Sequence, residues 1–281
     1  MSDFALSEPD LTREAILEID DENFTEESVA VVTGGASGIG EACTVALACN
    51  GLSVVAADID VEGLHATEDL AADLGATGQV IPVRTDLREA AAIERLVDIA
   101  ADAGDLNYVA NVAGLQHIAS IPDFPVETFD HLLGVMLRAP FLVTKHAFPA
   151  MDGTGAIANM CSVHGHYATV DKVAYITAKH GLTGLTRATA AEGEGSIRSF
   201  TVSPGYVLTP LMVDQIEDTA RERGISEREV IEDVMLGQAR TASMMTPAEV
   251  ANLFTFGFSK HGTHLNGGDL RWDGGFTSTY R

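Results

Sequence analysis

The chain has 281 residues and a formal net charge of −24, with 41 Asp and Glu against 17 Lys and Arg. This length predicts a single α/β domain with an ample core. The charge argues against nucleic acid and anionic membranes as partners, because binding to phosphate groups needs a basic surface. No apolar run is long enough to cross a bilayer.

Only four of the basic residues are lysines. An acidic, lysine-poor surface suits concentrated salt, where counterions screen self-repulsion, so we expect a salt-adapted protein. The alternative is an acidic protein in an ordinary cytosol. The three cysteines, Cys43, Cys49 and Cys161, are scattered without metal-binding spacing and predict a reducing, cytoplasmic location.

Residues 1–27 form an acidic N-terminal extension with ten Asp and Glu and one basic residue, Arg13. This composition is the opposite of a signal peptide. A short helix near residues 11–19 would either pack on a neighbour or stay loose, and the sequence leaves both open.

From residue 28 onward, predicted strands alternate with predicted helices. The strands fall at residues 28–32, 53–57, 80–84, 108–111, 156–161 and 197–202, and the helices at 41–48, 87–103, 129–150 and 173–192. This alternation predicts a doubly wound, Rossmann-type parallel sheet in one domain, residues 28–281. An acid-rich stretch at 216–238 predicts two further short helices.

The first predicted strand is followed by the glycine-rich turn Thr33-Gly-Gly-Ala-Ser-Gly-Ile-Gly40 and then by a helix. Such a turn lets a pyrophosphate approach the backbone, and the helix N-terminus supplies amide donors. Asp58 follows the next strand, at the spacing of the acidic residue that binds the ribose hydroxyls of NAD and repels the extra phosphate of NADP. No Lys or Arg lies in the loop or next to Asp58 in the sequence, so the cofactor is predicted to be NAD.

Tyr175 and Lys179 are one helical turn apart, and Ser162 lies thirteen positions before the tyrosine. A lysine on the same helical face favours the phenolate and is expected to lower the tyrosine pKa from its usual value of about 10. A serine hydroxyl beside the phenol would hold a substrate oxygen. This arrangement predicts proton transfer to or from an alcohol.

Together these motifs resemble the short-chain dehydrogenase/reductase family over roughly residues 28–276. Further matches are Asp86, the segment Asn111-Val-Ala-Gly114, and Ser203-Pro-Gly205 with Thr209-Pro210. The resemblance implies that Ser162, Tyr175 and Lys179 are catalytic. It implies cofactor contacts for Gly34, Ser37, Gly38, Ile39, Gly40, Asp58, Asp86, Asn111, Ala113, Gly114, Pro204, Gly205, Val207 and Thr209.

Polar residues around the predicted catalytic set indicate a donor-rich pocket, which suits a substrate with a carboxylate near its hydroxyl. Within the family, this pattern is most similar to the D-3-hydroxybutyrate dehydrogenases. That similarity implies NAD-dependent, reversible oxidation of D-3-hydroxybutyrate to acetoacetate, with Tyr175 as general base. It implies carboxylate contacts from Gln116, His164, Lys172 and Gln215, and pocket walls from Tyr206 and Phe276.

Several alternatives remain open. Gln116 could be an ordinary loop residue, Lys172 a surface charge and Phe276 a core residue. The enzyme could act on another small alcohol or a 3-oxoacyl substrate, or the chain could be a non-catalytic NAD-binding regulator. His164 and His166 form an H-x-H pair, but no third ligand of suitable spacing follows, so no metal site is predicted.

The resemblance also implies a homotetramer, with residues 264–281 packing between subunits, and a substrate lid at about 206–245 that excludes water. One position departs from the family. Met136 stands where an asparagine usually holds a water that links the lysine to solvent, and a methionine cannot donate a hydrogen bond.

Overall fold

Seven parallel strands form one sheet in the order β3-β2-β1-β4-β5-β6-β7 in the computed structural model, which describes residues 9–237 and 239–279. The predicted doubly wound sheet is confirmed, and the sequence missed only its edge strand β7. The strands are β1 (Ser28–Thr33), β2 (Ser53–Asp58), β3 (Val80–Arg84), β4 (Asp105–Asn111), β5 (Gly155–Met160), β6 (Ile197–Pro204) and β7 (Asp269–Trp272).

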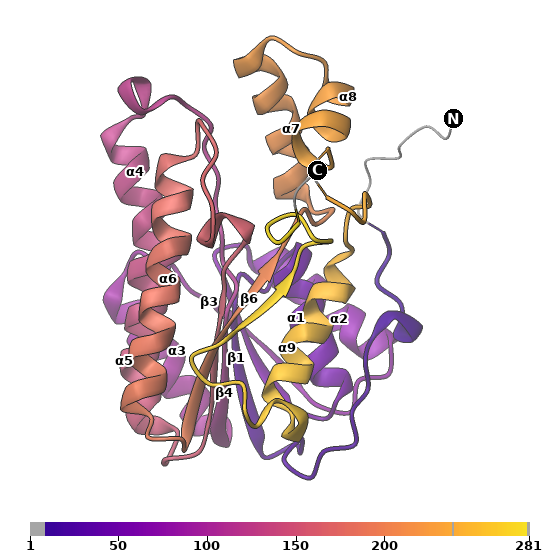
Figure 1. Ribbon diagram of the computed structural model, residues 1–281. Coiled ribbons are helices and arrows are strands. Elements are labelled where there is room, and N and C mark those ends of the chain that lie inside the picture. Colours follow the sequence, from indigo (N-terminus) through magenta and orange to yellow (C-terminus); the bar gives the residue numbers. More distant parts are fainter. Residues whose placement is uncertain (1–8, 238, 280–281) are drawn as a thin grey trace.

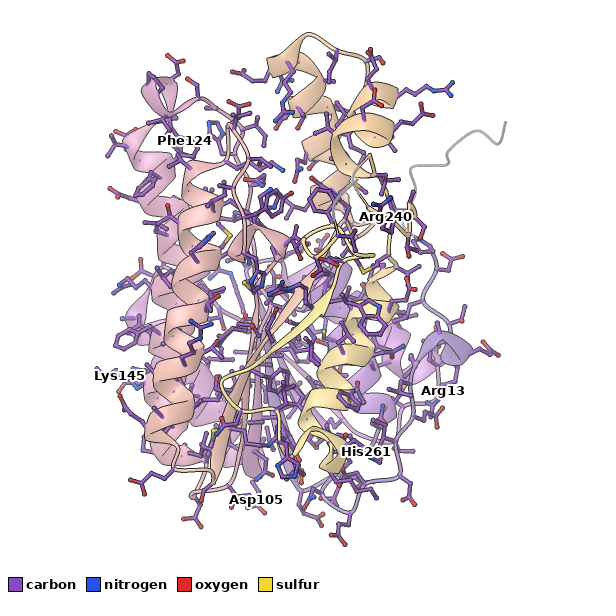
Figure 2. The ribbon with its side chains drawn as sticks, viewed as in Figure 1. Arg13, Asp105, Phe124, Lys145, Arg240 and His261 are labelled. Atoms are coloured by element: carbon purple, nitrogen blue, oxygen red, sulfur yellow. The ribbon has the colours of Figure 1, made fainter. Side chains whose placement is uncertain are left out.

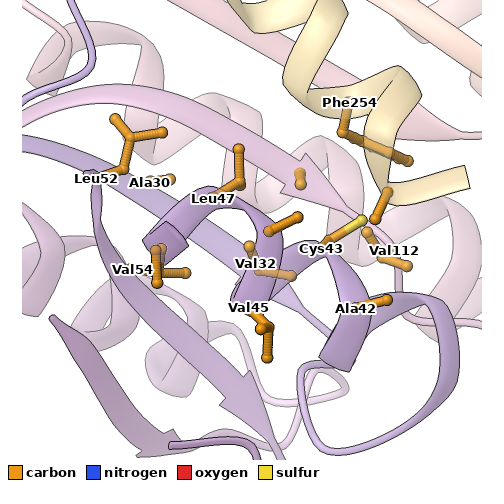
Figure 3. Close-up of a cluster of buried hydrophobic side chains, with 14 of the residues drawn as sticks. Ala30, Val32, Ala42, Cys43, Val45, Leu47, Leu52, Val54, Val112 and Phe254 are labelled. Atoms are coloured by element: carbon orange, nitrogen blue, oxygen red, sulfur yellow. The ribbon is translucent and has the colours of Figure 1, made fainter. Parts of the chain in front are cut away.

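Helices cover both faces of the sheet, as Figure 1 shows. One layer contains α3 (Ala90–Ala103), α5 (Ala139–Ala150) and α6 (Val173–Glu192), and the other contains α1 (Gly38–Cys49), α2 (Val61–Asp73) and α9 (Pro247–Phe258). Every residue of β1 is buried, because successive side chains point to opposite, covered faces. Val29 and Val31 join the core under α3 and α5, and Ala30 and Val32 join the core under α1 and α9 (Figure 3).

The helix predicted at 129–150 is interrupted. It consists of α4 (Val126–Leu133), the π-helical turn η3 (Gly134–Arg138) and α5. Single π-helical turns are rare and occur often at functional sites. Met136 lies in this turn, against the helix that contains Tyr175 and Lys179.

The N-terminal segment packs on the domain itself, with one 3-10 turn, η1 (Arg13–Ala15), in place of the predicted helix. Residues 1–8 lie outside the described part. Arg13, labelled in Figure 2, donates hydrogen bonds to the carbonyls of Cys49, Leu74 and Gly75, near the ends of α1 and α2. The Asn252 side chain accepts from the Leu17 amide at 2.8 Å and donates to the Ala15 carbonyl at 2.9 Å. The end of the turn and the residues directly after it are therefore fixed to α9.

Asn252→Ala is expected to lower the free energy of unfolding by about 1–2 kcal/mol, since two hydrogen bonds to the segment are lost. Denaturant titration at constant salt measures the change. Glu14→Gln is the matched control, because Glu14 lies exposed in the same segment and should shift the free energy by less than about 0.5 kcal/mol. Equal midpoints for the Asn252 variant and the native protein would contradict this role.

A small helical unit stands above the carboxyl ends of the strands (Figure 1). It consists of α7 (Pro210–Arg223), α8 (Glu227–Glu229) and the π-helical turn η5 (Val230–Met235), and Gln238 at its predicted end lies outside the described residues. Its own apolar cluster holds it together: Met212, Ile216, Val230, Ile231, Met235 and Leu236. No helix within residues 9–237 and 239–279 is long and apolar enough to span a membrane.

Candidate active site

A cleft of about 530 Å³ opens at the carboxyl ends of the strands, below α7. In a doubly wound sheet this edge, near the point where the strand order reverses, is where ligands bind. Nearly all of the predicted site residues line it: Gly34, Ser37, Gly38, Ile39, Gly40, Asp58, Asp86, Ala113, Gly114, Gln116, Ser162, His164, Lys172, Tyr175, Lys179, Pro204, Gly205, Tyr206, Val207, Thr209 and Gln215. Asn111 and Phe276 do not.

The glycine-rich loop is packed too closely for side chains. A Cβ at Gly40 would lie 1.8 Å from the Gly34 carbonyl oxygen, and Gly34 has φ +75° with Ala113 directly against it. Ser37 precedes α1 without capping it through its side chain, and the first residues of this helix line the cleft. The loop therefore fits a pyrophosphate at a helix N-terminus.

The Asp58 carboxylate is held at the other side of this loop. Its Oδ1 accepts from the Ile59 amide at 2.7 Å and the Asp60 amide at 3.1 Å, and its Oδ2 accepts from the Ala36 amide at 3.4 Å. No basic residue is next to Asp58 in the sequence, but Arg84 is its register partner on β3 and therefore lies beside it in the fold.

Asp86 lines the cleft but already has a cationic partner. Arg88, which also lines the cleft, forms a bidentate ion pair with it at 2.6–2.9 Å. The hydrogen bonds from Arg88 lower the pKa of Asp86 to about 2. Any contact of Asp86 with a cofactor adenine is therefore shared with this guanidinium, which the sequence did not predict.

Ser162, Tyr175 and Lys179 meet on the cleft wall, because β5 ends just before the serine and α6 presents the other two on one face. The Lys179 ammonium lies 5.2 Å from the centre of the Tyr175 ring and donates to the Met160 carbonyl at 2.7 Å. Burial lowers the pKa of Lys179 to about 8.

The expected lowering of the tyrosine pKa is not found in the protein alone. Burial raises the pKa of Tyr175 to about 12, and the hydrogen bond with Ser162 opposes this only in part. Lys179 directs its ammonium to a carbonyl and carries a reduced pKa itself, so it does not outweigh desolvation of the phenolate. Positive charge from a bound cofactor would have to supply the rest.

Lys172 is buried, not a surface charge, with 6% of its surface exposed. Its ammonium lies 6.0 Å from the centre of the Tyr206 ring and lines the cleft. Desolvation lowers the pKa of Lys172 to about 8, with Arg223 adding to the shift and Asp171 opposing it. A buried cation at a cleft calls for an anionic partner, because an unpaired charge is costly to bury.

His164 faces the cleft as a neutral imidazole. Burial, with a smaller effect of Lys172, lowers the pKa of His164 to about 3. Its Nε2 lies 3.1 Å from the Thr169 hydroxyl, and its ring stacks on Tyr167 and meets Tyr175 edge-on. A contact with a carboxylate would thus be a neutral hydrogen bond rather than an ion pair.

The two glutamines line the cleft from different elements, Gln116 after β4 and Gln215 on α7. Phe276 lies behind the wall, buried against Tyr167 and Tyr206 with ring centres 5.2 and 6.1 Å apart, respectively. Its predicted place in the wall is therefore indirect, through Tyr206.

Asn111 is buried beneath the loop rather than exposed to the cleft. Its Nδ2 donates to Asn159 at 2.9 Å, and Asn159 in turn donates to Thr186. Its role is to support the loop that carries Ala113 and Gly114, because it ends β4 directly before them.

Met136 places a thioether sulfur where the family usually has an asparagine. The side chain is buried, and its Sδ accepts a long hydrogen bond from the Leu115 amide at 3.4 Å. An asparagine-held water is therefore not available here, and Lys179 bonds to the Met160 backbone instead.

The H-x-H pair divides its imidazoles between different partners. His166 Nε2 lies 3.0 Å from Asp269 and 3.1 Å from the Ser203 hydroxyl, away from Thr169 and His164. Within the described ranges, no group of three His, Cys, Asp or Glu is placed to hold a metal ion.

The Rossmann-type sheet, the glycine-rich loop and the Ser–Tyr–Lys wall define a nicotinamide-dependent oxidoreductase. A family model described as enoyl-(acyl carrier protein) reductase matches residues 34–277. The chain is 37% identical over 254 residues to a D-beta-hydroxybutyrate dehydrogenase of Rhizobium meliloti, covering 89% of this chain and 98% of that protein. A second D-beta-hydroxybutyrate dehydrogenase, from Cupriavidus necator, is 34% identical over 256 residues, covering 89% and 97%. The chain belongs to the short-chain dehydrogenase/reductase family.

Solved structures agree on the fold. Levodione reductase superposes with a TM-score of 0.85 at 28% identity, covering 92% of this chain and all of that one. An actinorhodin polyketide ketoreductase with NADPH gives 0.84 at 26% identity, covering 90% and 98%. The fold therefore accommodates a nicotinamide dinucleotide.

Proposed function

We propose that the protein is an NAD-dependent D-3-hydroxybutyrate dehydrogenase that interconverts D-3-hydroxybutyrate and acetoacetate. The observation that carries this proposal is the buried Lys172 ammonium on the wall of the cleft that Gln116 and Gln215 also line. A small hydroxy acid would supply the missing anion. The similarity to two D-beta-hydroxybutyrate dehydrogenases supports the same substrate.

The proposed chemistry uses the chain's own residues as follows. Lys172, Gln116, Gln215 and neutral His164 hold the carboxylate, and Ser162 donates a hydrogen bond to the reacting oxygen. Tyr175 takes the hydroxyl proton as general base, and Lys179 holds the cofactor ribose. A bound nicotinamide supplies the hydride acceptor. The lid formed by α7, α8 and η5 excludes water.

The substrate class is tested by comparing D-3-hydroxybutyrate with its methyl ester and with 2-butanol in NAD reduction assays. We expect kcat/KM for the acid to exceed that for either neutral analogue by roughly 10²-fold or more, since the ion pair is lost. Preference for the neutral compounds would indicate that the substrate is an alcohol without a carboxylate. Cofactor binding without any turnover would favour a non-catalytic, NAD-binding regulator.

NAD is proposed as the cofactor because the amide-held Asp58 carboxylate would repel a 2′-phosphate. Asp58→Ser is expected to tighten NADPH binding by roughly tenfold or more, since a like-charge contact costs several kcal/mol and Arg84 remains nearby. Fluorescence titration with NADH and NADPH measures both affinities. Glu62→Gln is the control, because it removes the negative charge of an exposed side chain on the following helix, α2. An unchanged NADPH affinity in the Asp58 variant would count against the assignment.

Substrate binding should weaken with rising pH. The Lys172 pKa of about 8 means that the cation is present below pH 8 and is lost above it. In the unreactive complex with NADH, the dissociation constant of D-3-hydroxybutyrate is expected to rise about tenfold per pH unit above that pKa. The bound carboxylate raises the lysine pKa in the complex, so the rise levels off above that second pKa. A flat profile to pH 10 would exclude a lysine partner.

We further propose a cytoplasmic homotetramer adapted to high salt. The three cysteines are buried free thiols, which suits a reducing compartment.

Two large apolar side chains, Phe141 on α5 and Trp272 on edge strand β7, are more than half exposed and would be covered by subunit contacts in the proposed tetramer. Light scattering at molar salt tests the assembly. The terminal residues 280–281 of the predicted contact segment lie outside the described part.

A further inference from the structure

Asp171 contacts two segments that line the substrate side of the cleft. Its carbonyl accepts from the Ala119 amide at 3.0 Å, and the next residue, Lys172, pairs with Ala119 in an isolated parallel bridge. The loop that begins with Gln116 is thereby fixed to the loop that contains Lys172. Asp171 adopts φ +69°, a left-handed conformation that aspartate and asparagine tolerate better than most residues.

The Asp171 side chain reaches the lid. Its Oδ2 lies 3.7 Å from Nε of Arg223, the last residue of α7, and the two side chains are 17% and 26% exposed. The Arg223 Nε is itself buried and has no hydrogen-bond partner within the described ranges. A carboxylate just beyond hydrogen-bonding distance of a buried donor requires only a small movement of α7 to complete the bond.

Both residues also act electrostatically on the substrate side. Arg223 lowers the pKa of Lys172, and Asp171 raises it. Arg223 also influences Tyr206, whose ring faces the Lys172 ammonium. The ion pair therefore lies next to the group that would hold the carboxylate, although neither residue lines the cleft.

We propose that Asp171 and Arg223 are positioning residues that join α7 to the Lys172 loop. Closing their contact brings Gln215 on α7, Lys172 and the Gln116 loop into their binding positions together. The identity of the bound anion rests on the proposed function, whereas the mechanical connection does not.

The test uses the full-length protein with Asp171→Asn, Arg223→Gln and both combined. Asparagine keeps the left-handed backbone and nearly the same volume, so Asp171→Asn removes only the charge. Arg221→Gln is the matched control, because Arg221 lies on the same helix and forms its ion pair with Asp218 of that helix. Two readouts are taken: hydrogen exchange of residues 210–224 without ligands, and KM, kcat and the NADH dissociation constant.

We expect each single variant to speed exchange in α7 roughly threefold or more and to raise KM for D-3-hydroxybutyrate roughly three- to tenfold, with NADH affinity unchanged. The double variant should be no worse than the stronger single one, since both remove the same contact. Arg223→Lys keeps the positive charge and should change the exchange rate and KM less than Arg223→Gln does.

Unchanged exchange in both single variants, or an equal change in Arg221→Gln, would overturn the proposal. An effect of Asp171→Asn that Arg223→Gln does not reproduce would also overturn it, because Asp171 would then act on Lys172 alone. Failure of the native protein to oxidise any hydroxy acid would refute the proposed function. The exchange measurement would still show whether Asp171 and Arg223 join α7 to the Lys172 loop.

Discussion

Tyr175→Phe is expected to lower kcat for D-3-hydroxybutyrate oxidation by roughly 10²–10⁴-fold, the usual contribution of a general acid–base group. The substitution keeps the edge-on packing of the ring against His164 and removes only the hydroxyl. NADH affinity should change by less than about twofold, because the proposed pyrophosphate and ribose contacts are assigned to other residues that line the cleft. Steady-state kinetics with fluorescence titration measure both quantities.

Tyr108→Phe is the matched control, since Tyr108 is a buried tyrosine that packs between Phe24 and Phe258 outside the cleft. It should retain full activity. Near-native turnover in Tyr175→Phe would refute the base assignment. Burial raises the pKa of Tyr175 to about 12 in the protein alone. The pH dependence of kcat in the native protein therefore checks whether the bound cofactor lowers this pKa.

Lys172→Met is expected to raise KM for D-3-hydroxybutyrate roughly 10²-fold with kcat changed by less than about threefold. Methionine has a similar length and removes the buried cation that is proposed to bind the substrate carboxylate. Loss of one partner of a buried charge pair typically costs 2–5 kcal/mol. KM rises alone when the lost interaction is equal in the ground and transition states.

Lys145→Met provides the control, because Lys145 is exposed on α5, away from the cleft (Figure 2). It should leave both constants unchanged. An unchanged KM in Lys172→Met would contradict the carboxylate pocket. A loss of kcat as large as the rise in KM would instead assign Lys172 to the chemical step.

The parts of the site that sequence predicts are those in which local geometry determines chemistry. Gly34 and Gly40 are required because the loop has no room for a Cβ, and Tyr175 and Lys179 meet because they are one turn apart on α6. Such constraints act within a few residues and leave a pattern in the chain. The alternation of strands and helices does the same for the sheet.

The parts that sequence missed depend on contacts between distant segments. Arg84 lies beside Asp58 only through the β2–β3 register. The raised pKa of Tyr175 results from burial by many segments at once. The N-terminal segment is likewise held by Asn252, more than 200 residues further along the chain, and no local sequence pattern predicts that contact.

The most direct test of the central claim is NAD reduction with purified protein on D-3-hydroxybutyrate, with the L-enantiomer and NADP in parallel, at low and at molar salt. We predict turnover that is selective for the D-enantiomer, specific for NAD and strongest in molar salt. Turnover confined to another alcohol would leave the fold and the Ser162, Tyr175 and Lys179 assignments intact and would contradict the carboxylate pocket around Lys172.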